Sequence, residues 1–232
     1  QKGVEDNNVL NKGVCIAMDV NTGAILAMVT TDGYDLNNPY ELSAKDKKKI
    51  KSTAKSKQAE AESAALSNMW RNKAVADTYM PGSVFKMCVA SAALEENLVN
   101  EKTSFTCTGS ISVEGETIHC SNISGHGTQN FVEAISNSCN PAFIQIGQML
   151  GAGKFRQYYQ GFGFSDKTGI DLPGEADDEF WAEGKMGGVD LAVASFGQNF
   201  AITPIQMITA CAAVSNGGYV VQPHVVSKIT DS

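Results

Sequence analysis

The chain has 232 residues, enough for one large domain, and its hydrophobic content of 43% can build a substantial core. Its formal net charge of −7 argues against a nucleic-acid partner, because a phosphate backbone is bound by a cluster of basic side chains. One basic run, residues 45–57, stands apart, and we interpret it as a solvated helical face. No apolar stretch reaches about 18 residues, so the sequence predicts no membrane span.

The first part of the chain predicts a β-hairpin followed by helices. Residues 13–20 and 24–29 are apolar runs on either side of an Asn-Thr-Gly turn signal. Residues 41–72 contain no Gly or Pro and are rich in Lys, Ala, Glu and Ser, which predicts helical structure. Pro81-Gly82 then breaks the chain before a mostly buried helix over residues 83–96.

The middle of the chain predicts a small β region and two helices. Residues 105–120 are typical of two short strands around Glu114-Gly115, and residues 130–135 of a short helix. Asn140, as N-cap with a proline after it, begins a further helix that Gly151 ends.

The last part predicts a helix and a strand. Thr203-Pro204 begins the helix, which ends near Gly217-Gly218, and residues 219–226 predict a strand interrupted by Pro223. We expect this strand to share a sheet with the N-terminal hairpin. The order of elements predicts an α+β fold, an antiparallel sheet flanked by helices.

Ser83 and Lys86 are the first candidate pair for chemistry. They lie three positions apart at the start of a helix, so their side chains share one face. A serine hydroxyl needs a base to become a nucleophile, and a buried lysine with a lowered pKa supplies one. A plain N-cap role is the alternative for Ser83. Ser52 and Lys55 have the same spacing, but their charged surroundings indicate a surface helix.

Ser138 and Asn140 form a second candidate pair on a loop between two helices. Residues two apart on an extended loop project to one side. Ser138 could relay a proton between Lys86 and a leaving group, and Asn140 could hydrogen-bond a substrate amide. The alternative is that Asn140 only caps the helix that follows it.

Together these motifs resemble the transpeptidase domain of class B penicillin-binding proteins. Sporulation-type and elongation-type enzymes of Gram-positive bacteria, clostridia among them, are the nearest subgroup. The resemblance covers nearly the whole chain, and the charged insert near residues 41–66 fits it less well. The matching segments are 19–28, 34–39, 79–86, 126–127, 138–143, 168–175 and 196–204.

The resemblance implies the penicillin-binding, serine β-lactamase-like transpeptidase fold over residues 1–232, with its C-terminal part missing. The family's third motif is Lys-Thr-Gly on a sheet strand that lines the cleft. Lys167-Thr168-Gly169 has these letters, but its Gly-rich flanks indicate a loop, so we interpret it as a decoy. We expect the true motif, and half of the oxyanion hole, beyond the end of this chain.

The resemblance also implies a function. A peptidoglycan D,D-transpeptidase cross-links stem peptides through an acyl-serine, here at Ser83, and β-lactams acylate the same serine. We expect the extracytoplasmic face of the membrane, a membrane anchor outside these residues and a glycosyltransferase partner. A β-lactam-hydrolysing or β-lactam-sensing domain, and a non-catalytic scaffold of the same fold, are the alternatives.

Three cysteines and a histidine suggest a zinc site near the second motif. Cys107, Cys120, His126 and Cys139 could form a tetrahedral Cys3His site, with the first two on opposing strands of the small hairpin. A subset of class B enzymes from anaerobes resembles this arrangement. A Cys107–Cys120 disulfide and plain thiols are the alternatives. His119 is a rival ligand that should face away, and we expect His224 to be structural.

Overall fold

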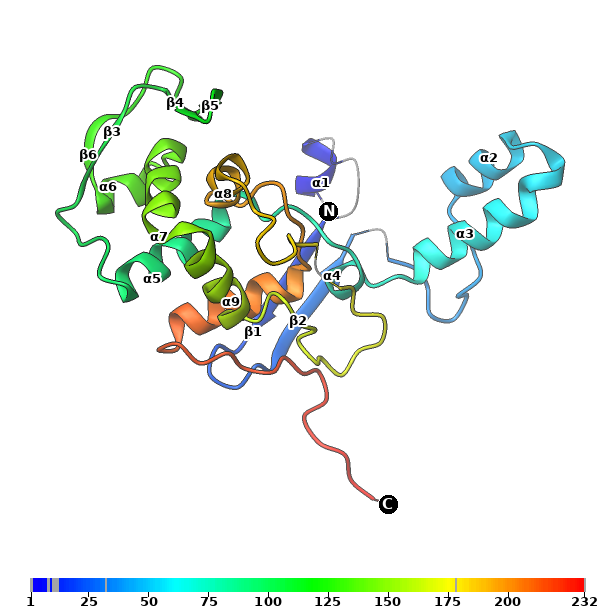
Figure 1. Ribbon diagram of the computed structural model, residues 1–232. Helices are drawn as coiled ribbons and strands as arrows, with labels where there is room; N and C mark the ends of the chain where they lie inside the picture. Colours follow the sequence, from blue (N-terminus) through cyan, green and yellow to red (C-terminus); the bar gives the residue numbers. More distant parts are fainter. Residues whose placement is uncertain (1, 8, 10–12, 32, 178, 232) are drawn as a thin grey trace.

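The computed structural model describes residues 2–7, 9, 13–31, 33–177 and 179–231. Its strands are β1 Val14–Met18, β2 Ile25–Thr30, β3 Ser104–Cys107, β4 Ser110–Val113, β5 Glu116–His119 and β6 Gly127–Asn130. Its helices are α1 Lys2–Asp6, α2 Ala44–Ser52, η1 Lys55–Lys57, α3 Gln58–Trp70, α4 Lys73–Ala76, η2 Gly82–Phe85, α5 Lys86–Glu95, α6 Phe131–Ser136, α7 Asn140–Gly161, α8 Gly188–Ala194 and α9 Pro204–Ser215. The α+β prediction is confirmed (Figure 1).

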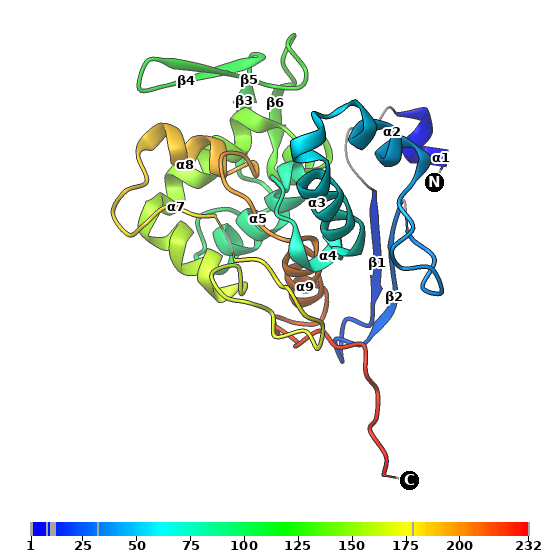
Figure 2. The same cartoon turned by 90° about the vertical axis from the view of Figure 1, so that its right-hand side faces the viewer.

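The predicted N-terminal hairpin is confirmed. Strands β1 and β2 pair antiparallel, with Ile16 opposite Met28. Asp19 shapes the turn by accepting the backbone N–H groups of Asn21 and Thr22, each at 2.9 Å. Helix α9 contacts β1 on one side and α5 on the other, and it lies between them in Figure 2. The hairpin therefore supports the helical body that carries Ser83.

The helical structure predicted over residues 41–72 is confirmed, and it is divided into α2 and the η1–α3 stretch. Thr53 and Ala54 are extended and separate α2 from η1 and α3. The hydroxyls of Ser52 and Thr53 both donate to the Lys49 carbonyl, which offers the backbone an alternative to continuing the helix. The two helices project from the body as an arm (Figure 1), and α2 buries no residue, as expected for a solvated face.

The buried helix at residues 83–96 is confirmed, with its first turn wound as the 3-10 helix η2. Phe85 ends that turn in the core, where its ring lies 4.8 Å from the ring of Phe200 and 5.9 Å from that of Phe155. Helix α5 packs along α7 and α9 and buries six of its residues. This packing fixes the direction in which the start of the helix faces.

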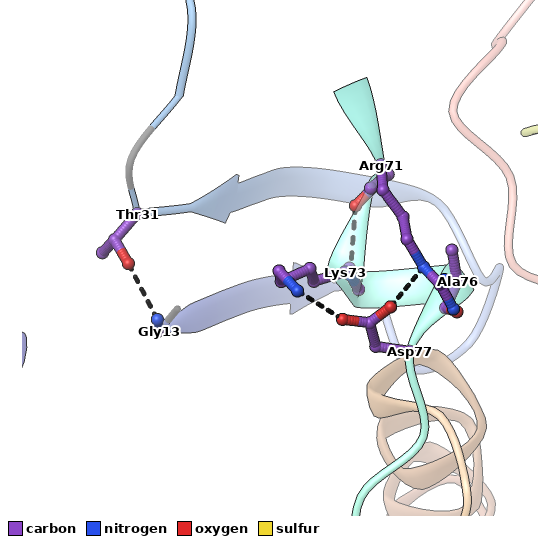
Figure 3. Close-up of polar contacts among 8 residues, drawn as sticks. Gly13, Thr31, Arg71, Lys73, Ala76 and Asp77 are labelled. Atoms are coloured by element: carbon purple, nitrogen blue, oxygen red, sulfur yellow. Dashed lines mark hydrogen bonds and ion pairs between the residues drawn. The ribbon is translucent and has the colours of Figure 1, made fainter. Parts of the chain in front are cut away.

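A charged cluster connects the arm to the body, as Figure 3 shows. Asp77 binds the side chains of both Arg71 and Lys73, with 2.6 Å between its Oδ2 and Lys73 Nζ. Lys73 is only 7% exposed, and a buried ammonium requires such a partner. Nearby, the Gly13 N–H donates to Thr31 Oγ1 at 2.8 Å, just beyond the ends of the hairpin strands. The segment that leads to Ser83 is therefore held against the sheet.

The small β region differs from the prediction of two strands. The hairpin around Glu114-Gly115 is present as β4 and β5. The segment before it breaks at Gly109, whose φ of +96° and closeness to the Ile123 carbonyl exclude a side chain. Strand β3 pairs instead with β6, which the sequence did not predict because residues 127–130 lack the apolar alternation of a strand.

The helices after residue 130 follow the sequence in part. The predicted short helix is confirmed as α6, and it begins with a capping box between Asn130 and Glu133. Gly151 does break α7, with a φ of +70°, but the chain resumes as a helix to Gly161. Helix α8 was not predicted. Helix α9 is confirmed, and Thr203 caps it.

The predicted strand at residues 219–226 is wrong. The segment makes one parallel bridge, Ala24 to His224, in which the Ile25 N–H donates to the His224 carbonyl at 2.8 Å. The next two N–H groups, of Val225 and Val226, donate to the carboxylate of Asp171, each at 2.7 Å. Because these two N–H groups are bonded to Asp171, they cannot extend the backbone hydrogen bonding to the hairpin, and the expected shared sheet is reduced to this single bridge.

Candidate active site

Ser83 is exposed, and the backbone around it is fixed by a second segment. The Gly82 N–H donates to the Gly197 carbonyl at 2.8 Å, and Tyr79 and Ile202 exchange backbone hydrogen bonds at 2.9 and 3.1 Å. Gly197 has a φ of +82°, and a Cβ there would lie 2.0 Å from the Gly82 carbonyl oxygen. These two glycines let the two segments approach closely enough to present Ser83 at the surface.

Lys86 is the centre of the site. It is 4% exposed, and its Nζ lies among four oxygens: Ser138 O at 2.7 Å, Asn140 Oδ1 at 2.8 Å, Ser138 Oγ at 2.9 Å and Ser83 Oγ at 3.2 Å. Ser83, Ser138 and Asn140 therefore converge on it. The sequence placed Ser83 and Ser138 beside Lys86 but did not predict the contact of Asn140 with Lys86.

Burial makes Lys86 easier to deprotonate than an ordinary lysine. Burial lowers its pKa to about 8, while negative charge on the Cys120 and Cys139 sulfurs acts in the opposite direction. A neutral amine has two N–H donors and one lone pair. Two of the four neighbours, the Ser138 carbonyl and Asn140 Oδ1, can only accept. When the two donors satisfy these oxygens, the lone pair is free to take a proton from the Ser83 hydroxyl.

The loop that holds Lys86 is strained and well anchored. Ser138 has a φ of +49°, unusual for a residue with a side chain. Hydrogen bonds from the Ser138 N–H to Ile135 and from the Cys139 N–H to Ala134 hold this turn. The strain aims both the hydroxyl and the carbonyl of Ser138 at Lys86.

Asn140 does not cap a helix, which corrects the alternative drawn from the sequence. The N-cap of α7 is Cys139, and Asn140 is the first helical residue. Its side chain bridges instead, with Oδ1 on Lys86 and Nδ2 donating to the His119 carbonyl at 3.2 Å. The sequence missed this last contact, since nothing local marks His119 as a backbone partner.

The three cysteines and His126 also come together. The ligand atoms of Cys107, Cys120, His126 and Cys139 all lie within 4.8 Å of one another, and Cys120 Sγ lies 3.6 Å from His126 Nδ1. All three cysteines are buried and free. Cys107 and Cys120 are not on opposing strands of one hairpin, which corrects the prediction: Cys107 ends β3, which pairs with β6, and Cys120 follows β5.

This cluster fits a tetrahedral metal ion in its donor set. Three sulfurs and an imidazole nitrogen are ligands that zinc prefers, and sulfurs around zinc lie about 3.8 Å apart. The observed spread of up to 4.8 Å closes with small side-chain movements. Cys139 faces the cluster, while Ser138 and Asn140 face Lys86, so the two groups share one short loop. The rival ligand His119 is exposed and outside the cluster.

The two look-alike motifs lie outside this site. Glu175 accepts the backbone N–H and the hydroxyl of Thr168, at 2.8 and 2.6 Å, and Lys167 pairs with Asp177 at 3.3 Å. Residues 167–169 thus form a loop, as interpreted from their flanks. In the second Ser-x-x-Lys pair, the Ser52 hydroxyl donates to its own helix backbone on the exposed arm.

A nucleophile whose proton acceptor is a lysine, rather than a histidine, defines one class of serine acyl-transferases. The comparison with known families agrees. The family described as "Penicillin binding protein transpeptidase domain" matches residues 13–232, and the chain belongs to this family. The resemblance to class B enzymes of sporulation and elongation type is confirmed.

Two relatives illustrate the relationship. Stage V sporulation protein D of Bacillus subtilis (strain 168) is 41% identical over 162 residues, which are 69% of this chain and 25% of that protein. Peptidoglycan D,D-transpeptidase PbpA of Mycobacterium tuberculosis (strain ATCC 25618 / H37Rv) is 30% identical over 228 residues, 94% of this chain and 43% of that protein. The chain thus spans less than half the length of these curated relatives.

Solved structures share the fold. Penicillin binding protein 3 from Mycobacterium tuberculosis, complexed with aztreonam, matches with a TM-score of 0.77 at 24% identity, covering 97% of this chain and 45% of that one. Pseudomonas aeruginosa PBP2, in complex with WCK 5153, matches with a TM-score of 0.78 at 23% identity, covering 98% and 52%. Among the described residues, no helix is both long enough and apolar enough to span a membrane.

Proposed function

We propose that this chain supplies the nucleophile and base of a peptidoglycan D,D-transpeptidase. The observation that carries the proposal is the environment of Lys86, a buried lysine bound by Ser138 and Asn140 and 3.2 Å from the exposed hydroxyl of Ser83. The relatives named as D,D-transpeptidases support the same activity.

The proposed reaction has two steps. Ser83 Oγ attacks the carbonyl of the penultimate D-alanine of a stem peptide, and its proton passes to Lys86 Nζ. The C–N bond breaks, and the departing D-alanine amine takes a proton from Lys86 through the Ser138 hydroxyl, which is 2.9 Å away. An amine of a second stem peptide then attacks the acyl-serine and forms the cross-link. Its proton returns along the same route, and Ser83 leaves as the hydroxyl.

A β-lactam follows the first step only. Attack by Ser83 opens the lactam ring, and the released nitrogen stays tethered to the acyl group, so it cannot leave. Asn140 holds Lys86 during this step through Oδ1. The second N–H of its amide, beside the one given to His119, can donate to a substrate carbonyl.

The third family motif is proposed to come from chain that follows residue 232. Lys167 and Thr168 support this placement, because their side chains are engaged by Asp177 and Glu175 in a loop. A Lys-Thr-Gly strand elsewhere would complete the wall of the cleft and the oxyanion hole.

Zinc is proposed as a structural ion in the cluster of Cys107, Cys120, His126 and Cys139. Four ligand atoms converge there, where a Cys107–Cys120 disulfide would need only two. A bound ion would supply cross-linking between the β region and the Ser138 loop. Metal analysis of protein purified without chelator tests this proposal, because absent zinc together with the loss of two free thiols would establish the disulfide.

The proposal also covers the location and the partners of this domain. We place the domain at the extracytoplasmic face of the membrane, anchored by a segment outside these residues, with a membrane glycosyltransferase supplying the strands to be cross-linked. A PBP2 from Helicobacter pylori has been solved in complex with MreC, so assembly with a partner occurs in a protein of this fold.

Labelling of the full-length protein with a fluorescent penicillin tests the function. We expect a stable label that Ser83→Ala abolishes and that the matched control Ser52→Ala, in the second Ser-x-x-Lys pair, leaves intact. Rapid turnover of the label would instead establish a β-lactam hydrolase. A wild-type protein that takes no label would establish a non-catalytic scaffold.

A further inference from the structure

Asp190, in the first turn of α8, has a carboxylate to which the proposed reaction assigns no role. Its two oxygens bind different segments. Oδ2 accepts a hydrogen bond of 3.0 Å from the Gly187 N–H, just before the helix, and Oδ1 accepts one of 3.2 Å from Asn199 Nδ2. The first contact caps the helix. The second contact is not part of the cap, because Asn199 lies after the end of α8 at Ala194.

Asn199 ends a short segment, residues 196–199, whose backbone is unusual. Its φ is +65°, and that of Gly197 is +82°. Asparagine adopts this left-handed conformation more readily than most residues, but the conformation persists only when its surroundings hold it. The hydrogen bond to Asp190 holds Asn199 at one end of the segment. At the other end, Phe196 packs against an apolar cluster of Val113, Ile144 and Ala192.

The middle of the 196–199 segment supports the nucleophile. The Gly197 carbonyl accepts the N–H of Gly82, the residue directly before Ser83, at 2.8 Å. Gly82 has a φ of +61°, so this hydrogen bond fixes a backbone conformation that sets the direction of Ser83. Ser83 Oγ lies 3.2 Å from Lys86 Nζ, which is at the long end of the hydrogen-bond range. A small shift of the backbone before Ser83 therefore separates the nucleophile from its base.

We propose that Asp190 and Asn199 are positioning residues, whose hydrogen bond holds the 196–199 segment so that Ser83 faces Lys86. The proposal rests on the acyl-transfer function proposed above. The pair acts on Ser83 only through the backbone contact just described. Asn199 is exposed and Asp190 half-buried, and a hydrogen bond near the surface contributes little to the stability of the whole fold. Its loss should therefore lower the rate of acylation while the protein stays folded.

The first test breaks the contact and keeps the backbone preference. Aspartate tolerates left-handed backbone as asparagine does, but in Asn199→Asp the new carboxylate faces that of Asp190, and the like charges repel. In the full-length protein, we expect the limiting rate of acylation by a fluorescent penicillin to fall about 10- to 100-fold, because the reacting group is misplaced. The affinity for penicillin before acylation and the pH midpoint of the rate should stay those of the wild type, because Lys86 is unchanged.

A double variant tests the hydrogen bond itself. When Asp190→Asn is added to Asn199→Asp, the donor and the acceptor exchange places: the new amide donates to the new carboxylate, and its oxygen still accepts the Gly187 N–H. We expect the double variant to acylate at nearly the wild-type rate, whereas two independent structural defects would add. Asn97→Asp is the matched control, since Asn97 is exposed with a φ of +55°, and it should leave the rate unchanged.

Amide hydrogen exchange at Gly82 reads the same contact without any reaction. Exchange of this N–H should be faster in Asn199→Asp and return to the wild-type rate in the double variant, with circular dichroism to check that each is folded. Wild-type acylation and exchange in Asn199→Asp would refute the proposal, as would a double variant as slow as Asn199→Asp. A wild-type protein that takes no penicillin would refute the proposed function, while exchange at Gly82 would still test whether the pair holds the segment.

Discussion

Asn140→Asp tests the claim that Lys86 acts as a neutral base. The substitution keeps the size and the oxygen that meets Lys86 Nζ at 2.8 Å, but it adds a negative charge there. A carboxylate at this distance favours the ammonium form and raises the pKa of a lysine by roughly 1–3 units. From its value of about 8, the pKa of Lys86 should therefore rise to about 9–11.

The magnitude follows from the fraction of neutral amine. At pH 7 a lysine with a pKa of about 8 is about one-tenth neutral, and raising the pKa by 1–3 units cuts that fraction by about 10- to 1,000-fold. Acylation at pH 7 should fall by the same factor and recover as the pH rises. In the wild type, acylation should rise about tenfold from pH 7 to well above pH 8, because deprotonation of Lys86 supplies the base.

The assay is the second-order rate of acylation by a fluorescent penicillin, measured from about pH 6 to about pH 10. The variant also loses the hydrogen bond to the His119 carbonyl, but that loss lowers the rate at every pH, whereas the new charge moves the midpoint. Asn130→Asp is the matched control, since it adds the same charge at an exposed helix cap. A midpoint that stays near 8 in Asn140→Asp would refute the assignment of Lys86 as the base.

Three further predictions concern the scaffold. Gly197→Ala should unfold at a lower temperature and acylate more slowly, because its Cβ would meet the Gly82 carbonyl at 2.0 Å; an unchanged melting temperature in a thermal scan would contradict this. Asp77→Ala leaves the buried Lys73 without its carboxylate partner, so it should lower the free energy of unfolding, measured in urea, by about 3–5 kcal/mol. A loss under about 1 kcal/mol would show that the pair is only a surface contact. Asp171→Ala should speed amide hydrogen exchange at residues 225 and 226, whose N–H groups it accepts, and unchanged exchange there would show that the segment is held otherwise.

Signals between neighbouring residues were enough to predict where several helices begin. The Pro81-Gly82 break and the apolar residues after it marked the helix that presents Ser83, since a proline and a capping residue act within one turn. Thr203-Pro204 likewise marked the start of α9, and in the structure Thr203 and Gln206 form a capping box there. Where such signals were absent, as at β6 and α8, the elements were missed because tertiary packing forms them.

Long-range contacts decided the rest of the site. The letters of residues 167–169 match a family motif, yet Glu175 and Asp177 hold them in a loop. Asn140 has the sequence of a helix cap, yet its side chain bridges Lys86 and the His119 carbonyl. In each case a partner distant in sequence or outside the motif outweighed the local preference.

By itself, the sequence determined which residue types are present for acyl transfer and for a sulfur-rich site, because spacing on a helix and on a loop puts side chains on one face. Only the tertiary structure decided that Ser83, rather than Ser52, has a buried lysine and a second serine beside it. It also brought four ligand atoms together from separate strands and loops. The physical reason is that burial and strain depend on what packs against a residue, and those neighbours lie far away along the chain, as Asn140 does from Lys86 and Gly197 from Gly82.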